Sequence, residues 1–408
     1  HLWNELEKND DIYLSNYSGW YSVSDEAFYN EDEIEEIDSK KVAKLSRSSV
    51  EWIEEESYFF RLSKWEKPLL EYYKSNPYFI APESRKNEVI SFVKSGLKDL
   101  SISRKTFSWG IPVPNNEKHV IYVWLDALTN YLSALEYPDK DHELFKKFWP
   151  ASIHLIGKDI LRFHAVYWPA FLLAAKIDLP KKIYGHGWIL SGEEKMSKSK
   201  GNILDPLKIV EKYGLDPLRY YLIKEVSFGN DGNISQERLE DCINSDLANN
   251  YGNLCQRVVA FAIKNCKGKV PNEIKFQDED FIILNKFKNN LENIRSKIDE
   301  QNINFYIDYI VNSLFEANKY FNDQEPWKKK DNLIRLNTIV YTTLEIVRKI
   351  SFLLYPIIPE SSLKALKIFN ISENEINLSS IENNEYLLKD NNINKIDILF
   401  NKIEKNND

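Results

Sequence analysis

The sequence predicts an α/β domain built on a parallel sheet, preceded by a small β and helical segment and followed by an all-α helical bundle. Three observations lead to this prediction. From Ser101 to about residue 190, short apolar runs alternate with longer helical patterns, as in βαβ units. The chain before Ser101 passes from β-like aromatic stretches to helical spacing. The chain after about Gly232 shows long helical patterns and few strand signals.

Length, charge and cysteine content narrow the class of protein. At roughly 100 to 200 residues per domain, a chain of 408 residues allows two to four domains. The net charge of -8 means that a nucleic-acid partner would need a local basic surface. Three cysteines without paired close spacing argue against a disulfide framework and a cysteine zinc site. No apolar run approaches the roughly 20 residues of a membrane helix, so we expect a soluble, cytoplasmic protein without a membrane partner.

The first hundred residues divide into two patterns. Residues 1–65 are polar and acidic, with turn residues at 9–11 and an aromatic stretch at 19–21, and these features predict small β structure. Residues 66–98 carry apolar side chains at helical spacing and predict helices.

The next segment predicts the parallel sheet. Residues 119–124, 152–156 and 182–184 are short apolar runs that indicate buried strands, and residues 160–175 indicate the helix between the second and third. In such a sheet the functional groups collect beyond the carboxyl ends of the strands, where the candidate site residues fall.

The remainder predicts a helical bundle and a tail. Helical patterns cover residues 247–264, 281–298, 303–321, 333–355 and 360–369. The tail from about Ser372 is too polar to bury much before residues 396–400, so we expect it to wrap over the surface.

The residue string Lys195, Met196, Ser197, Lys198, Ser199 is the most informative in the chain, and Lys200 follows it. It places three ammonium groups on one loop between a predicted strand and a helix that begins near Pro206. Lysine is a point charge on a flexible stem, so such a loop can follow the charge of a polyphosphate. A lysine-rich loop can equally be a solvated basic surface.

The order of these residues is identical to the KMSKS signature of class I aminoacyl-tRNA synthetases, in the sequence context where that family carries it. The resemblance implies ATP and Mg2+ as cofactors, and a loop that stabilises the triphosphate during attack on the α-phosphate. It implies that Lys198 and Lys195 are catalytic and that Met196, Ser197 and Ser199 also contact ATP.

The segment that contains Trp124, Ala127 and Tyr131 follows a predicted strand and carries aromatic faces around a small residue. Such a site can enclose a flexible thioether, although core packing explains each residue equally well. The segment resembles the methionine pocket of methionyl-tRNA synthetases. The resemblance assigns methionine binding to six residues: Trp124, Ala127, Leu128, Tyr131, Ile160 and His164.

Two further segments resemble nucleotide-binding motifs of the same family. Gly157 and Asp159 precede Ile160 and would lie near the ribose or the aminoacyl group. In residues 184–189 the resemblance assigns ATP binding to His186, Gly187, Trp188 and Ile189. Glycine lets the backbone approach a ligand closely, and a mere tight bend remains the alternative for Gly187.

The helical region carries a second resemblance. Asn253 and Arg257 lie one turn apart on one predicted helix, and Trp327 follows another. A guanidinium, an amide and an exposed indole can bond to and stack on unpaired bases. In methionyl-tRNA synthetases the matching residues read the anticodon CAU, which implies tRNA(Met), initiator and elongator, as the partner.

The resemblance divides the chain into four parts and implies an (incomplete) Rossmann-like parallel sheet with a connective insertion. The first part is a connective insertion at 1–100, with a β knuckle and helices, and the second is the second half of the Rossmann-like catalytic domain at 101–190. The third part is the signature loop and stem-contact region at 191–240. The fourth is the α-helical anticodon-binding domain with its tail at 241–408. Where some relatives bind zinc through paired cysteines, residues 22–25 read Ser-Val-Ser-Asp, so no zinc or other metal site is expected in the protein.

The family's N-terminal half, with its HIGH signature and an aspartate for the amino group of methionine, finds no match in these residues. We therefore expect the chain to be the larger C-terminal part of a bacterial-type, monomeric methionine–tRNA ligase, inactive alone. The family activates L-methionine with ATP to methionyl-adenylate and transfers it to the 3′ end of tRNA. A synthetase for another aliphatic amino acid and a non-catalytic tRNA-binding fragment are the alternatives.

Overall fold

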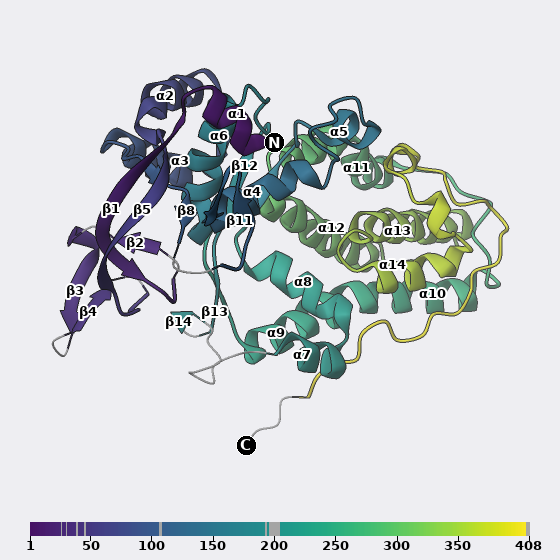
Figure 1. Ribbon diagram of the computed structural model, residues 1–408. Helices are drawn as coiled ribbons and strands as arrows, with labels where there is room; N and C mark the ends of the chain where they lie inside the picture. Colours follow the sequence, from purple (N-terminus) through teal and green to yellow (C-terminus); the bar gives the residue numbers. More distant parts are fainter. Residues whose placement is uncertain are drawn as a thin grey trace. The chain divides into compact units, whose positions relative to one another are not determined.

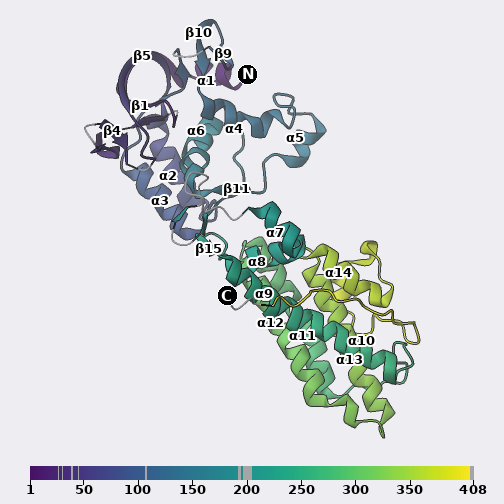
Figure 2. The ribbon, with the colours of Figure 1, turned by 90° about the horizontal axis from the view of Figure 1, so that it is seen from below.

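The computed structural model describes residues 1–25, 27–29, 31–37, 40–44, 46–105, 108–191, 194–195 and 205–404. Its internal contacts divide the chain into two units, His1–His186 and Gly187–Asp408, and each is described by itself (Figures 1 and 2). The predicted class, an α/β part followed by an all-α bundle, is confirmed. Among the described helices, none is both long enough and apolar enough to cross a lipid bilayer.

A long antiparallel pair of strands forms the first β structure. β1 (Ile12–Ser22) pairs with β5 (Glu51–Phe60), and β2 (Ala27–Tyr29) and β7 (Leu100–Ser101) complete a sheet in the order β2-β1-β5-β7. β3 (Ile34–Ile37) and β4 (Lys40–Ala43) form a separate hairpin. The prediction of small β structure is therefore confirmed for this stretch, with one exception at its start.

The exception is α1 (Leu2–Lys8), a helix in a segment that we predicted to be β and turn. Its side chains Leu2, Trp3 and Leu6 are buried in the core of the first unit. Leu6 lies one helical turn after Leu2 and Trp3, but a helix of seven residues is too short for the sequence to reveal its periodicity.

The parallel sheet has the strand order β11-β12-β6. β11 (His154–Gly157) and β12 (Ile183–His186) confirm two of the three predicted strands and lie side by side, with Gly157 opposite His186. The third member, β6 (Ile80–Ala81), lies between α2 (Glu66–Ser75) and α3 (Glu83–Lys94). The sequence did not predict β6, because a strand of two residues is too short to show the alternation of apolar and polar side chains.

The prediction that residues 119–124 add a strand to this parallel sheet is wrong. β10 (Asn116–Ile121) pairs antiparallel with β8 (Ser103–Arg104) and β9 (Pro112–Val113) in a sheet of its own. The rest of the apolar run begins α4 (Val123–Ser133), whose Leu125, Leu128 and Leu132 are buried at helical spacing. The short apolar run concealed a change from strand to helix, which places Trp124 on a helix.

The predicted helix at residues 160–175 is confirmed and is irregular. A 3-10 turn (Lys158–Ile160) leads into a π-helical segment (Phe163–Tyr167) and then α6 (Trp168–Ala174). Pro169 has no N–H to donate within the helix, and the hydroxyl of Tyr73 donates instead to the carbonyl of Ala165, four residues earlier. Single π turns of this kind occur often at functional sites. α5 (Glu143–Phe148) completes this unit's helices.

The second unit begins with a small sheet and ends in the bundle. β13 (Ile189–Ser191) pairs with β14 (Glu194–Lys195) and with β15 (Gly232–Ile234). Helices follow at α7 (Pro206–Tyr213), α8 (Leu215–Glu225), α9 (Gln236–Cys242), a π-helical segment (Ile243–Gly252), α10 (Asn253–Asn265), α11 (Asp278–Asp299), α12 (Ile303–Gln324), α13 (Leu333–Leu354) and α14 (Pro359–Leu366). The five predicted bundle helices are confirmed, and each begins or ends within a few residues of the prediction.

The tail lies over α13, but it buries more than its composition predicted, because Ile381, Leu387 and Ile393 belong to the core of the second unit. α13 is buried along nearly its whole length, including the charged residues Glu345, Arg348 and Lys349. The ammonium of Lys349 donates to the carbonyl of Ile381 (2.6 Å), and Arg348 donates to the carbonyl of Ser380 (3.2 Å). Buried charges are tolerated when they are paired and hydrogen-bonded, so the tail belongs to the bundle's core.

Candidate functional site

The predicted methionine pocket is built from α4 and the helical run after β11, both in the first unit. The Tyr131 hydroxyl lies 2.9 Å from Nε2 of His164, and Nδ1 of His164 lies 3.0 Å from the carbonyl oxygen of Ile160. The Trp124 ring stacks on Phe163, with centroids 3.6 Å apart and planes 9° apart. The structure thus brings Tyr131, Ile160 and His164 together, and Trp124 stacks on Phe163, the residue before His164.

The hydrogen bonds fix the protonation state of His164. A carbonyl can only accept, so Nδ1 carries the proton and donates to Ile160. Burial lowers the pKa of His164, against the opposing effect of that hydrogen bond, so the ring is neutral at pH 7. Its Nε2 then accepts the proton of the Tyr131 hydroxyl, whose own pKa burial raises. The pair therefore presents no net charge.

The remaining two predicted pocket residues lie differently. Ala127 is exposed on α4, whereas Leu128 is fully buried in the core of the first unit. Trp124, Ala127, Leu128 and Tyr131 follow one another at one-turn spacing, so they share one side of α4. The structure does not show Leu128 open to a ligand, and its burial is that of a core residue.

Sequence reasoning missed three aromatic side chains around this pocket: Phe163, Trp168 and His154. The His154 ring lies 4.2 Å from the Tyr131 ring and 6.2 Å from the His164 ring, and Trp168 lies 6.3 Å from Tyr131. Burial, and then the proximity of His164, lowers the pKa of His154 to about 4. Phe163 and Trp168 could have been found from their helical spacing with Ile160 and His164. His154 carried no signal beyond lying in a strand.

The predicted nucleotide residues of the first unit lie at the carboxyl end of the parallel sheet. Gly157 ends β11 directly opposite His186, which ends β12. A Cβ added at Gly157 would come 2.5 Å from Oδ1 of Asp159, so a larger residue would require that carboxylate to move. Gly157, Asp159 and His186 are therefore close together at the sheet edge where parallel sheets hold their ligands.

The three other predicted nucleotide residues are in the second unit. A Cβ at Gly187 would come 2.2 Å from the backbone of Asn230, which accounts for the glycine by close packing. The Trp188 N–H donates to Oδ1 of Asp231 (2.8 Å), and its carbonyl accepts from Gly232 (2.8 Å). Ile189 begins β13 beside Gly232. The segment 187–191 is thus held firmly against residues 230–234.

The signature loop is only partly described. The backbone of Lys195 ends β14, opposite Leu190 of β13, while Met196, Ser197, Lys198 and Ser199 lie outside the described residues. The chain returns at Asp205, whose Oδ1 accepts from the N–H of Leu207 (2.9 Å) and caps α7. The predicted helix start near Pro206 is confirmed.

The predicted anticodon residues gather at the meeting of α10 and α12. Arg257 donates from Nη2 to Oδ1 of Asn322 (2.7 Å) and lies over the Phe321 ring at 5.6 Å. Trp327, which is 40% exposed, meets the same ring edge-on at 6.1 Å. Phe321 therefore links Arg257 with Trp327, and Asn253 lies one turn before Arg257 on α10. Sequence reasoning missed Phe321 and Asn322.

The turn at residues 22–25, where we expect no zinc, contains a carboxylate with several hydrogen-bond donors around it. Asp25 accepts hydrogen bonds from the hydroxyls of Tyr29, Ser46 and Ser48. Burial raises the pKa of Asp25, but these bonds outweigh burial and leave the pKa below its usual value. The described part of the chain contains no cluster of three or more His, Cys, Asp or Glu side chains suited to a metal ion.

Comparison with known proteins gives the same family along the chain. Residues 36–259 match the family of class I tRNA synthetases (M), and residues 270–408 match the anticodon binding domain of methionyl tRNA ligase. The chain is 50% identical to the methionine–tRNA ligase of Brucella suis biovar 1 over 372 residues, which cover 91% of this chain and 72% of that protein. It is 50% identical to the Rickettsia felis enzyme over 383 residues, 92% of this chain and 73% of that protein.

Solved structures similar to this chain belong to the same family. The Mycobacterium tuberculosis methionyl-tRNA synthetase in complex with methionyl-adenylate has a TM-score of 0.94 and 46% identity, covering 98% of this chain and 79% of that chain. The apo form of the same enzyme has a TM-score of 0.93 and 43% identity, covering 99% of this chain and 80% of that chain.

Proposed function

This chain belongs to the class I methionyl-tRNA synthetase family, and from that premise we propose which of its residues carry each step of the reaction. The activity is that of a methionine–tRNA ligase. It uses ATP to convert L-methionine to methionyl-adenylate with release of pyrophosphate, and transfers the methionyl group to the 3′ end of tRNA(Met). The share of this chain aligned with its relatives supports the assignment.

We assign methionine selection to the aromatic pocket of the first unit. The observation that carries this assignment is the chain of bonds from Tyr131 through His164 to Ile160, which fixes a neutral imidazole beside an aromatic wall. Such a wall favours an uncharged, polarizable thioether and disfavours a charged side chain, because burying an unpaired charge costs free energy. Trp124 contributes the wall's face, and Ala127 leaves room for the ligand beside it. Leu128 would support the pocket from the core.

ATP binding is assigned to the sheet edge and the signature loop. Gly157, Asp159 and His186 would hold the nucleoside, with backbone groups of Gly187, Trp188 and Ile189 reading the adenine. The residues Lys195, Met196, Ser197, Lys198 and Ser199 would contact the phosphates. Lys198 and Lys195 stabilise negative charge that develops in the transition state, which lowers the barrier without covalent catalysis. Mg2+ would enter with ATP and offset phosphate charge.

We assign anticodon reading to Asn253, Arg257 and Trp327. Arg257 is oriented by Asn322 and Phe321, so its remaining donors are positioned before RNA binds. The half-exposed Trp327 offers a face for a base to stack on. Initiator and elongator tRNA(Met) share the anticodon CAU, so both are proposed substrates.

The remaining assignments concern the organisation of the protein. We propose the four-part division at residues 1–100, 101–190, 191–240 and 241–408, and a knuckle held by Asp25 without zinc. We also propose that the protein is a monomer. Because translation consumes methionyl-tRNA, we propose that the protein works in the cytoplasm.

The decisive experiment is ATP–pyrophosphate exchange on the full-length protein with methionine, leucine, isoleucine and valine in parallel. Methionine should support exchange with a kcat/KM at least 100-fold above that of the other three. Lys198→Ala should lower kcat strongly while leaving the affinity for methionine nearly unchanged, because the lysine acts in the transition state. Exchange that is equally fast with leucine would contradict the assignment of the pocket.

A further inference from the structure

Two charged side chains of α8 hold the turn that joins α13 to α14. The backbone N–H of Ser361 donates to Oδ2 of Asp216 over 2.7 Å. Arg219, one turn further along α8, donates from Nε to the carbonyl of Ile357 (2.7 Å) and from Nη2 to the carbonyl of Pro356 (2.8 Å). We call this pair, Asp216 and Arg219, the α8 clamp.

The α8 clamp is matched to the ends of the two helices that it grips. Ser361 lies in the first turn of α14, where backbone N–H groups lack partners within the helix and the helix dipole is positive. Ile357 and Pro356 follow the last turn of α13, where carbonyls are in excess. A carboxylate at the first end and a guanidinium at the second are the charges that these ends favour.

Asp216 has few alternatives to this contact. Its side chain is buried, and Oδ1 has no hydrogen-bond partner within the described residues. A buried carboxylate is costly unless its charge is compensated. The bond to Ser361 places this carboxylate at the positive end of α14.

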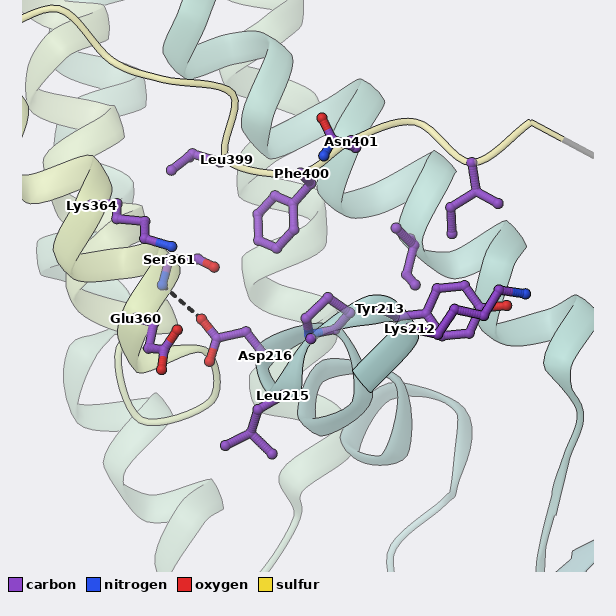
Figure 3. A pocket seen from close by; sticks show the side chains of 14 residues that line it. Lys212, Tyr213, Leu215, Asp216, Glu360, Ser361, Lys364, Leu399, Phe400 and Asn401 are labelled. Atoms are coloured by element: carbon purple, nitrogen blue, oxygen red, sulfur yellow. Dashed lines mark hydrogen bonds between the residues drawn. The ribbon is translucent and has the colours of Figure 1, made fainter. Parts of the chain in front are cut away.

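A cavity of about 240 Å3 borders the clamp (Figure 3). Figure 3 shows the carboxylate of Asp216 reaching Ser361 beside Glu360, with Lys364 and the tail residues Leu399 and Phe400 around the space. Asp216, Ser361 and the tail therefore meet at one place in the second unit.

A second set of contacts ties α8 to the helix that leads into α10. The Tyr220 hydroxyl donates to Oδ2 of Asp246 (2.9 Å), and the ammonium of Lys224 lies 2.6 Å from the same oxygen. Asp246 belongs to the π-helical segment that runs directly into α10, which carries Asn253 and Arg257. The π-helical segment is thus a second part of the bundle that α8 holds by charged groups, in addition to the apolar packing of Tyr220 and Tyr221 in the bundle core.

The opposite end of α8 contacts the small sheet from which the signature loop departs. Val226, the residue after α8, packs on Gly232, where an added Cβ would come 2.5 Å from its methyl groups. Gly232 begins β15, which pairs with β13, and β13 pairs with Lys195 of the signature. α7, which follows the signature, is joined to α8 at Gly214. α8, a helix of 11 residues, therefore contacts both the small sheet beside the signature and the bundle.

We propose that Asp216 and Arg219 are positioning residues that hold the anticodon-binding bundle in register with the segment that carries the signature loop. They touch no substrate. Their effect is on the delivery of a whole tRNA, whose anticodon and 3′ end must be held at the same time. This inference rests on the proposed function, because it takes the roles of the bundle and of the loop from there.

The test uses the full-length protein with Asp216→Asn and Arg219→Gln, and three readouts. These are methionine-dependent ATP–pyrophosphate exchange, the Kd for an isolated RNA hairpin that carries the CAU anticodon, and kcat/KM for charging whole tRNA(Met). We expect exchange and hairpin binding to stay within twofold of the unsubstituted protein, while charging falls at least tenfold. Arg219→Lys, which keeps the charge, should recover part of the loss.

Glu360→Gln is the matched control, because it makes the same chemical change beside Ser361 without touching the α8 clamp. Charging by the Asp216 and Arg219 variants at the rate of this control would overturn the proposal. A parallel fall of all three readouts with the melting temperature would also overturn it, because the residues would then be merely structural. If Asp216→Asn does not fold, the partly exposed Arg219 carries the test. Absence of exchange in the unsubstituted protein would instead overturn the proposed function.

Discussion

His164, which is assigned to methionine, is buried and held by hydrogen bonds, whereas Trp327, which is assigned to the anticodon, is half-exposed. His164 is 3% exposed and both its ring nitrogens are hydrogen-bonded. Trp327 is 40% exposed, and its ring makes an edge-to-face contact with the ring of Phe321. Ordered, neutral side chains can select a small uncharged ligand, while unpaired bases need open faces on which they can stack.

This difference predicts which activity a substitution in each region should affect. In the first unit a change alters the shape and the protonation of a neutral pocket, so it should affect methionine activation. In the bundle a change removes a contact surface, so it should affect tRNA recognition and leave activation intact.

The largest effect should come from Trp124→Ala. Loss of the indole removes the stacking surface for Phe163 and opens the pocket wall, so kcat/KM for methionine in exchange should fall about 100-fold, or about 3 kcal/mol. Binding of the anticodon hairpin should not change. Trp124→Phe, which keeps an aromatic face, should recover most of the activity. A variant with full exchange activity would remove Trp124 from the pocket.

The second prediction concerns pH and the first unit alone. Burial lowers the pKa of His154 from 6.5 to about 4, so the unfolded chain takes up a proton before the folded one does as the pH falls. Stability is therefore fully present above about pH 6.5 and declines between 6.5 and 4, by at most about 3 kcal/mol at 1.36 kcal/mol per pKa unit.

Urea unfolding between pH 4.5 and 7.5 measures this decline. His154→Phe keeps a ring in the same place and should flatten the pH dependence, with the residual slope belonging to His164. An unchanged slope in this variant would show that His154 is not buried in its neutral form.

The third prediction concerns RNA binding by the bundle. Trp327→Ala removes the stacking face, so binding of the CAU hairpin should weaken by about 1 to 3 kcal/mol, while exchange stays within twofold. Trp52→Ala is the matched control, because Trp52 is 51% exposed and lies in the first unit. Equal loss of hairpin binding in both variants would indicate a non-specific effect.

The smallest effect should come from Asp25→Asn. The carboxylate accepts three hydroxyl hydrogen bonds that keep its pKa low, so its loss should cost about 1 kcal/mol of unfolding free energy at pH 7. The cost should disappear as the pH falls through the carboxylate's range, since the unsubstituted side chain is then protonated too. Asp141→Asn, at an exposed ion pair, is the control. Destabilisation of the unsubstituted protein by a zinc chelator would contradict this account of the knuckle.

Sequence reasoning found the features that depend on residue order or on long periodicity. The order of residues 195–199 identified the synthetase family, and the long helices from Asp278 to Leu354 followed from their apolar spacing. It failed where an element is short or changes type. The run 119–124 concealed the step from β10 to α4, and β6 has too few residues to show any pattern.

Within the candidate site, the sequence predicted residues but not their contacts. In the sequence, Phe163 and His154 look like ordinary core residues. Only their distances to Trp124 and Tyr131 place them beside the residues assigned to methionine. The proton on Nδ1 of His164 depends on the position of one carbonyl. The bond from Arg257 to Asn322 joins residues 65 positions apart, which requires the packing of α10 on α12.

Methionine activation and anticodon recognition are assigned to separate residues. The most direct test of this assignment is methionine-dependent ATP–pyrophosphate exchange, measured in parallel on Trp124→Ala and Trp327→Ala in the full-length protein. We predict that exchange falls about 100-fold in the first and stays within twofold of the unsubstituted protein in the second. A comparable loss in both variants would show that the pocket and the anticodon residues do not act separately and would contradict the account.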